Sequence, residues 1–327
     1  MIELDQIDKK AASVLDGYLV RKDLVRTFSR QFPVPTYVVE FMLGRYCAST
    51  DQEEIDEGLE IVQRQLKSRT VRAGEEELFK AKALETGEVK IIDLVTARVD
   101  NKGEYVASLP SLRLTDVRIS SELVNQHERM LTGGFYAELG VTFDVAIAQE
   151  AKGRPFGITS LREIQLSKRD VLETLSKARA EFTSEEWKSL LLRSIGIEPA
   201  GLNERQKNAL LLRMVPFVER NYNLVELGPR GTGKSYFFSE FSPYATLISG
   251  GQATKATLFY NNARRKVGLV GFWDTVAFDE VGGIKVRDPD TIQIMKDFMA
   301  NGRFSRGAEV IADASLSFVG NIDVSVQ

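Results

Sequence analysis

One eight-residue motif constrains the fold of this chain more than any other feature. Residues Gly228–Ser235 read Gly-Pro-Arg-Gly-Thr-Gly-Lys-Ser and fit the phosphate-binding loop pattern G-x-x-x-x-G-K-[ST]. An apolar run, Tyr222–Leu227, precedes the motif, and a run that can continue as a helix, Tyr236–Phe241, follows it. A buried strand, a glycine loop and a helix in this order predict a nucleotide-binding α/β domain.

The whole motif supplies the candidate nucleotide-binding residues: Gly228, Pro229, Arg230, Gly231, Thr232, Gly233, Lys234 and Ser235. Glycines let backbone N–H groups turn toward phosphates, and a helix start offers more of them. We expect Lys234 to reach the β- and γ-phosphates and the Ser235 hydroxyl to ligate magnesium. The expected cofactors are therefore ATP and Mg²⁺; the alternative is a glycine-rich turn before a core helix.

An acidic pair follows a second strand-like run. The run Thr275–Phe278 ends in Asp279 and Glu280, and Asp279 lies 44 positions after Ser235. Ligands of open parallel sheets bind at the carboxyl ends of the strands. We expect Asp279 to hold the metal and Glu280 to act as a catalytic residue that orients and deprotonates the attacking water. The alternative is a strand that simply meets solvent.

A third strand-like run, Ala314–Asn321, ends in a polar amide, and a helical pattern, Asp288–Gly302, separates it from the acidic pair. We expect Asn321 to lie beside the γ-phosphate and to help hold the lytic water, as a second catalytic residue. Asparagine also ends strands for local reasons. The order of loop, acidic strand, helix and polar-tipped strand resembles the AAA+ ATPase core, in which Asn321 matches sensor 1.

The amino-acid composition excludes several classes of protein and of functional site. A chain of 327 residues with a net charge of −3 suggests two or three domains and no basic signature as a whole, so nucleic-acid contact would need local patches. Cys47 is the single cysteine and excludes an internal disulfide, and His127 is the single histidine, which leaves little for a histidine-rich metal site. Neither a signal peptide nor a long apolar span is evident, so we expect a cytoplasmic protein without a membrane partner.

The pattern along the chain predicts a multidomain α/β protein. Residues 1–86 read as a helical amino-terminal region and 167–221 as a helical connector. Residues 87–166 carry strand-like runs at 89–95, 104–109, 113–119, 135–139, 142–147 and 158–166, which favour a small β-barrel; an oligonucleotide-binding (OB) type and a β-sandwich fragment both remain open. Residues 222–327 would form an incomplete AAA+ P-loop αβα core that stops after sensor 1.

The chain resembles a particular family of this class, the Lon-like AAA+ ATPases of BREX phage-defence systems. The likeness is carried by Tyr222–Tyr236, Ile248–Thr254 and Phe278-Asp279-Glu280, and it covers essentially all 327 residues. It implies self-association into a ring, DNA and other defence components as partners, and a Lon-like protease-type domain after the ATPase. This sequence stops before that domain and before the family's arginine finger and lid, so we expect nucleotide binding with poor hydrolysis.

Candidate DNA-binding residues lie in a glycine-bracketed segment before the third strand. In related rings a hairpin at this place contacts DNA in the pore, which would let Arg303 and Arg306 pair with phosphates and Phe304 stack or brace the loop. The alternative is a solvated turn with Phe304 in the core. Two further basic clusters are weaker candidates: Lys255 with Arg264–Lys266, and Arg21, Lys22, Arg26 and Arg30 around Leu24, Val25 and Phe28.

Three functions remain open from the sequence. The first is an ATP-driven ring that encloses and translocates DNA. The second is a protein unfoldase, for which the aromatic-apolar run Leu258–Tyr260 is the nearest candidate for a gripping loop, although it fits a buried helix face better. The third is a nucleotide-gated scaffold on DNA with little turnover, which a Glu280→Gln variant would separate from a motor.

Overall fold

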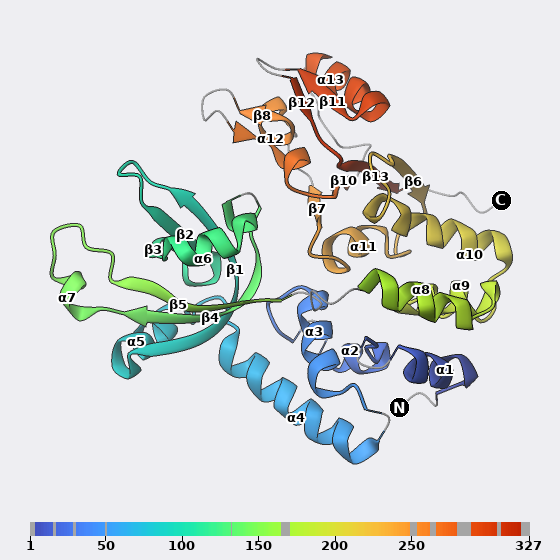
Figure 1. The fold of residues 1–327 in the computed structure, drawn as a ribbon, viewed down its shortest axis with the longest axis horizontal. Coiled ribbons are helices and arrows are strands. Elements are labelled where there is room, and N and C mark those ends of the chain that lie inside the picture. The colour runs from blue at the N-terminus through green and yellow to red at the C-terminus, as the bar shows by residue number, and fades with distance from the viewer. Residues whose placement is uncertain are drawn as a thin grey trace. The chain divides into compact units, whose positions relative to one another are not determined.

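The computed structural model describes residues 4–15, 18–28, 31–49, 51–131, 133–164, 171–248, 254–261, 266–279, 289–305 and 309–321. The chain divides into two compact units, Met1–Gly196 and Ile197–Gln327 (Figure 1). This division falls inside residues 167–221, where the sequence suggests one helical connector. The helices α8 (Val171–Glu181) and α9 (Ser184–Ser194) therefore lie in the first unit, and α10 (Glu204–Leu211) lies in the second.

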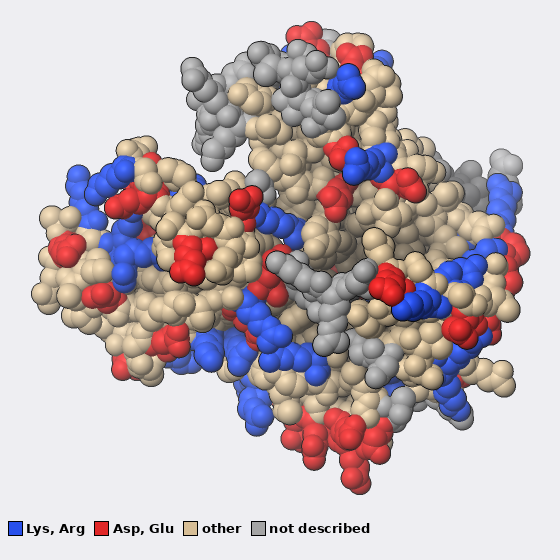
Figure 2. Space-filling view, viewed as in Figure 1, with Lys and Arg blue, Asp and Glu red and all other residues tan. Residues whose placement is uncertain are grey.

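Helices open the first unit, as expected. They are α1 (Gln6–Val14), α2 (Lys22–Phe28), α3 (Thr36–Tyr46), α4 (Gln52–Arg69) and α5 (Glu76–Thr86). The carboxylate of Asp51 accepts the backbone N–H groups of Glu53 and Glu54 and so caps α4, whose last turn carries Lys67 and Arg69. Figure 2 shows the acidic start of α4 as a red group at the bottom of the view. The charges at the two ends of α4 thus match the helix dipole.

The helices bury one apolar cluster. It includes Val38 and Met42 from α3 and Val62 and Leu66 from α4, together with Ile92 of the first strand. From α2 the cluster takes Leu24, Val25 and Phe28, while Arg21 pairs with Asp23 at 2.7 Å and Lys22 pairs with Glu40. These contacts favour α2 as a docking helix. Cys47 is buried in the same cluster, which raises the pKa of its thiol.

Five strands form a closed barrel in the order β1-β2-β3-β5-β4. They are β1 (Glu88–Val99), β2 (Tyr105–Leu109), β3 (Leu114–Arg118), β4 (Phe135–Phe143) and β5 (Phe156–Glu163). The short helices η1 (Pro110–Leu112), α6 (Ser121–Gln126), η2 (Glu128–Leu131) and α7 (Val145–Ala148) connect them. Side chains such as Ile91, Leu109 and Leu139 fill the interior. The barrel, not the β-sandwich fragment, is the architecture.

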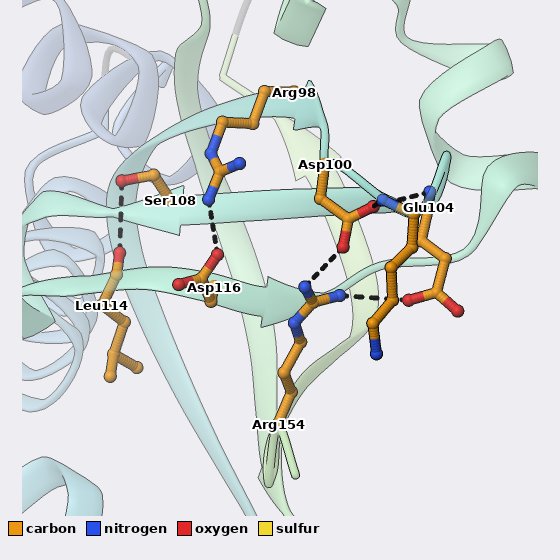
Figure 3. Close-up of polar contacts among 8 residues, drawn as sticks. Arg98, Asp100, Glu104, Ser108, Leu114, Asp116 and Arg154 are labelled. Carbon is orange, nitrogen blue, oxygen red and sulfur yellow. Dashed lines mark hydrogen bonds and ion pairs between the residues drawn. The ribbon is translucent and has the colours of Figure 1, made fainter. Parts of the chain in front are cut away.

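A hairpin joins β1 to β2, with Val99 opposite Tyr105. Its turn is held by Arg154, which lies before β5 and donates to Asp100 at 2.5 Å and to Glu104 at 3.1 Å (Figure 3). Arg98 of β1 reaches across β2 and donates to Asp116 of β3 at 2.5 Å. The Arg154 guanidinium holds the pKa of Asp100 at about 2. Two loops that are far apart in sequence are therefore tied by a charged hydrogen-bond network.

One strand prediction is wrong in this region. The run Thr142–Ile147 does not form a strand of its own, because β4 continues only to Phe143 and α7 then begins. The Asp144 side chain accepts the N–H groups of Ala146 and Ile147 and starts the helical turn. A local side-chain cap therefore outweighs the β-propensity of the apolar residues.

The helices α8 and α9 close the first unit. Thr183 and Glu186 form a capping box at the start of α9. The same helix pairs with α1, because Arg193 donates to Asp5 at 2.7 Å and to Asp8 at 2.9 Å. The pKa of Asp5 is lowered to about 2, mainly by this hydrogen bond.

The second unit is built on a four-stranded parallel sheet in the order β6-β13-β10-β7. The strands are β6 (Leu224–Gly228), β7 (Ala245–Ile248), β10 (Thr275–Phe278) and β13 (Ser315–Asn321). The other elements are η3 (Leu212–Phe217), α11 (Lys234–Glu240), α12 (Lys255–Leu258), β8 (Tyr260–Asn261), β9 (Lys266–Val267), η4 (Leu269–Gly271), α13 (Pro289–Asn301), β11 (Arg303–Ser305) and β12 (Glu309–Ile311). The predicted helix between the acidic and polar-tipped strands is α13.

The core of this unit packs aromatic rings beside the sheet. Phe259, Phe278 and Phe298 are fully buried, and Val276 and Leu316 join them from β10 and β13. No helix within the described ranges of either unit is long and apolar enough to cross a membrane.

Candidate nucleotide site

The ends of three strands meet at one edge of the parallel sheet. β13 lies between β6 and β10, with Asn321 opposite Gly228 and Phe318 opposite Phe278. Asp279 follows β10 directly, so it lies at the same edge. The sheet therefore brings the start of the glycine loop, the polar tip and the first acid together, although long stretches of chain separate them in sequence (Figure 1).

The glycine loop joins β6 to α11. Gly231 and Gly233 have φ values of 78° and 75°, in the left-handed region that side chains other than glycine rarely adopt. A Cβ atom built on either glycine would meet no atom within 4 Å, so the backbone conformation, not crowding, requires glycine at both positions. Gly233 precedes α11 and has no side chain to cap its first amides. The loop thus has the backbone shape that phosphate binding requires.

Lys234 is the first residue of α11 and only 5% exposed. Its ammonium donates to the carbonyls of Gly228 at 3.1 Å and Pro229 at 2.6 Å, and to the Thr232 hydroxyl at 3.2 Å. A buried cation needs such partners. All three acceptors belong to the loop, so the charge lies within the span where phosphates would sit.

Ser235 and Asp279 meet as the metal prediction requires. The Ser235 hydroxyl donates to a carboxylate oxygen of Asp279 at 2.9 Å, and the backbone N–H of Asp279 donates to the Ile248 carbonyl at 2.9 Å. One hydroxyl and one carboxylate fit Mg²⁺, which takes few protein ligands and completes its shell with water and phosphate oxygens. Over the described residues, no three His, Cys, Asp or Glu side chains gather into another metal site.

Of the two predicted catalytic residues, the structure describes Asn321 but not Glu280. Asn321 ends β13, and its side chain is exposed beside the start of the glycine loop. Glu280 follows Asp279 but lies outside the described residues, so its role stays a prediction. Of the motif itself, Pro229, Arg230 and Thr232 lie on the exposed part of the loop, and the Thr232 hydroxyl also donates to the Pro229 carbonyl at 3.2 Å.

Two charged residues near this loop did not follow from the sequence: Arg213 contacts the loop, and Glu226 pairs with Arg213. Arg213 in η3 is 5% exposed and makes a two-pronged ion pair with Glu226 of β6. Its Nη1 also donates to the Thr232 carbonyl at 3.1 Å. A usable signal was present, because Glu226 interrupts the apolar strand Tyr222–Leu227, and an acid on a strand within a sheet needs a partner.

The predicted DNA-contacting hairpin exists, but one of its residues does not have the expected place. β11 and β12 pair antiparallel, with Phe304 opposite Val310. Phe304 is 4% exposed, and its ring lies 5.1 Å from that of Phe259 and 6.1 Å from that of Phe298. Of the two roles expected for Phe304, stacking on bases does not fit this burial, whereas bracing the loop does. Arg303 is exposed, and Arg306 lies outside the described residues.

In the second candidate DNA-binding cluster, Lys255 with Arg264–Lys266, the lysine forms an ion pair within the protein. Lys255 donates to Asp290 of α13 at 2.9 Å and is mostly covered, with 18% of its side chain exposed. Arg264 and Arg265 lie outside the described residues, as does the side chain of Lys266. Lys255 is thus better accounted for as a contact between α12 and α13 than as a DNA ligand.

Comparison with known proteins agrees with this arrangement along the whole chain. Residues 13–143 match the family described as BREX system Lon protease-like protein BrxL N-terminal, and residues 156–327 match Lon-like protease BrxL-like, ATPase domain. The chain is 47% identical over 313 residues to the Lon-like protease BrxL of Escherichia coli O9:H4 (strain HS) and 45% identical over 326 residues to that of Bacillus cereus (strain H3081.97).

These alignments cover 95% and 99% of this chain but 45% and 48% of the two relatives, so the chain spans about half of their length. The resemblance seen in the sequence is confirmed, and the matched ATPase domain implies nucleotide binding. The chain belongs to the BrxL family of Lon-like proteins of BREX systems.

Proposed function

We propose that this chain is the ATP- and Mg²⁺-binding AAA+ part of a ring-forming complex that binds and translocates DNA in BREX phage defence, in the cytoplasm. The observation that carries the nucleotide part is the shared edge of β6, β13 and β10, where Ser235 and Asp279 are hydrogen-bonded beside the glycine loop. Membership of the family supports the defence role and the other BREX components as partners.

Each residue of the site then has a task. The loop amides and Lys234 hold the phosphates, and Ser235 and Asp279 hold the metal, which supplies charge neutralisation at the phosphate oxygens when it is bound. Glu280 takes a proton from the attacking water, and Asn321 orients that water. Lys234 must exchange at least one of its three loop acceptors for a phosphate oxygen, because an ammonium has only three N–H donors.

The barrel of the first unit fits the OB type in its five strands and closed form, and we propose it as that type. Its arginines Arg98 and Arg154 lie in ion pairs (Figure 3), and on the face drawn in Figure 2 basic side chains lie among acidic ones. On the face drawn, DNA contact would therefore depend on local basic sites rather than on a broad basic surface, and Arg303 of the second unit is a separate candidate.

The protein-unfoldase alternative has less support. Of the candidate gripping run Leu258–Tyr260, Leu258 and Phe259 are fully buried in the core of the second unit, and Tyr260 is partly buried against that core. A pore loop that grips polypeptide would have to expose such side chains. The nucleotide-gated scaffold differs from the motor only in turnover, and Glu280→Gln separates the two: phage resistance that survives this change would favour the scaffold.

Salt-dependent DNA binding, with and without a non-hydrolysable ATP analogue, tests the DNA part. We expect the affinity for DNA to fall steeply as the salt concentration rises. Arg303→Gln should make the slope of log affinity against log salt concentration shallower by about the amount that one phosphate contact contributes. The matched control is Arg220→Gln, which removes another exposed arginine of the same unit. Lack of measurable DNA affinity at low salt, or equal slopes for both variants, would contradict the assignment of Arg303.

A further inference from the structure

We propose that Arg213 is a positioning residue for the phosphate loop, acting through the Thr232 peptide and anchored by Glu226. The inference rests on the proposed nucleotide site and adds a residue that lies outside its sequence motif. Arg213 precedes the motif by a full strand and reaches it from η3.

The geometry of Arg213 uses three of its donor groups. Nε donates to both carboxylate oxygens of Glu226, at 3.0 and 2.8 Å, and Nη2 donates to one of them at 2.5 Å. Nη1 is thereby turned toward the loop, where it donates to the Thr232 carbonyl at 3.1 Å. Because the guanidinium is planar and rigid, the Glu226 pair fixes the direction of the Nη1 group.

Fixing the Thr232 carbonyl also fixes the amide that follows it. A trans peptide is planar, so the C=O of Thr232 and the N–H of Gly233 point in opposite directions. Arg213 therefore holds the Thr232 carbonyl on its own side of the peptide, and the Gly233 N–H points to the opposite side. A carbonyl rotated toward the phosphates would repel them, and this contact opposes that rotation.

The element that carries Arg213 also contacts the rest of the site. The Phe217 ring of η3 lies 5.3 Å from Phe237, 5.7 Å from Phe238 and 5.9 Å from Phe241, all on or directly after α11. At the other side of η3, the Pro216 carbonyl accepts the hydroxyl of Thr275, the first residue of β10, at 2.9 Å. η3 thus contacts the loop, the helix that begins with Lys234 and the strand that leads to Asp279.

The experiment separates positioning from simple stability. Arg213→Met leaves the Glu226 carboxylate without its charge partner, and we expect a large loss of stability. The double variant Arg213→Met/Glu226→Met removes both charges, and we expect its melting temperature to return toward wild type. Its Kd for ATP with Mg²⁺ should nevertheless stay about fivefold to tenfold higher, since the Thr232 contact is still absent.

Arg213→Lys gives an independent reading if the double variant does not fold. Lysine can keep the charge opposite Glu226 but cannot reproduce the fork, so ATP affinity should fall about as far, with little change in melting temperature. Arg220→Met is the control for loss of an exposed arginine.

Wild-type affinity in the folded double variant, or in Arg213→Lys, would overturn the role of Arg213. ATP binding by the wild type and by Lys234→Ala tests the proposed nucleotide site separately. If the wild type binds no ATP, that site and the inference both fail; if it binds and only Lys234→Ala loses affinity, the inference alone fails.

Discussion

At the scale of single residues, the candidate site depends on side chains that already have partners. Lys234 is held by two carbonyls and a hydroxyl, and Ser235 donates to Asp279. Such contacts keep buried polar groups hydrogen-bonded and near the positions that a ligand needs. Binding at this site would therefore exchange hydrogen-bond partners rather than create all of them anew.

The Ser235 hydroxyl gives a prediction that is specific for the metal. Ser235→Ala should weaken ATP binding about tenfold when Mg²⁺ is present and change it little when Mg²⁺ is chelated, because the lost oxygen serves the metal. Calorimetric titration in both conditions measures this. Ser239→Ala, which removes an exposed hydroxyl from the same helix, is the matched control. An equal loss in both conditions would show that Ser235 does not act through a metal.

Asp93 gives a prediction about pH. This carboxylate is 4% exposed in the barrel and accepts the Ser111 hydroxyl at 2.7 Å; burial raises its pKa to about 6. The folded state therefore binds the proton more tightly than the unfolded state, whose pKa is 3.8. The unfolding free energy should fall as pH rises from about 4 to about 6 and stay constant above that range.

Asp93→Asn should remove this part of the pH dependence, as measured by denaturant unfolding at a series of pH values. Asp116→Asn on β3 has the same change in net charge at an exposed position and serves as the control. A slope between pH 4 and 6 that persists unchanged in Asp93→Asn would refute the assignment to this residue.

At the scale of elements, close contacts decide which helices can pack. Gly58 lies in the middle of α4, where a Cβ atom would come within 2.1 Å of the Tyr46 carbonyl oxygen and 2.8 Å of the Cys47 sulfur. A glycine inside a helix normally weakens it. Here the missing side chain lets α4 approach the end of α3, and the cluster around Val62 closes over the contact.

Gly58→Ala tests this contact. The backbone clash should outweigh the gain in helix propensity and destabilise the first unit by about 1–3 kcal/mol. Glu57→Ala, at an exposed neighbouring position of α4, is the control. Thermal unfolding measures the stability of both variants. A Gly58→Ala protein with the melting temperature of the wild type would show that α3 and α4 can move apart at little cost.

At the scale of the whole molecule, local sequence signals predicted individual helices, strands and turns. The long-range contacts between these elements could not be predicted from such signals. The glycine loop, the caps of α4 and α9 and the hairpin turn at Asp100 are encoded by neighbouring residues, and all are present. The placement of β13 between β6 and β10, and the pairing of β3 with β5 that closes the barrel, join segments distant in sequence.

The directions in which particular side chains point also could not be predicted from the sequence. The sequence left Phe304 open between a DNA-contacting place and the core, and only its packing against Phe259 and Phe298 decides for the core. Arg213 lies outside every motif, and only the fold brings its guanidinium to Glu226 and the loop. Both cases depend on tertiary packing, which decides the face that a strand or short helix buries.

The most direct test of the account is calorimetric titration of ATP with Mg²⁺ into the folded wild-type chain and into Lys234→Ala. We expect saturable binding of about one nucleotide per wild-type chain. We expect at least about tenfold weaker binding for Lys234→Ala, since one charge-assisted contact to phosphate contributes about 1.4 kcal/mol or more. Folded wild-type protein that takes up no ATP, or a Lys234→Ala variant that binds as tightly as wild type, would contradict it.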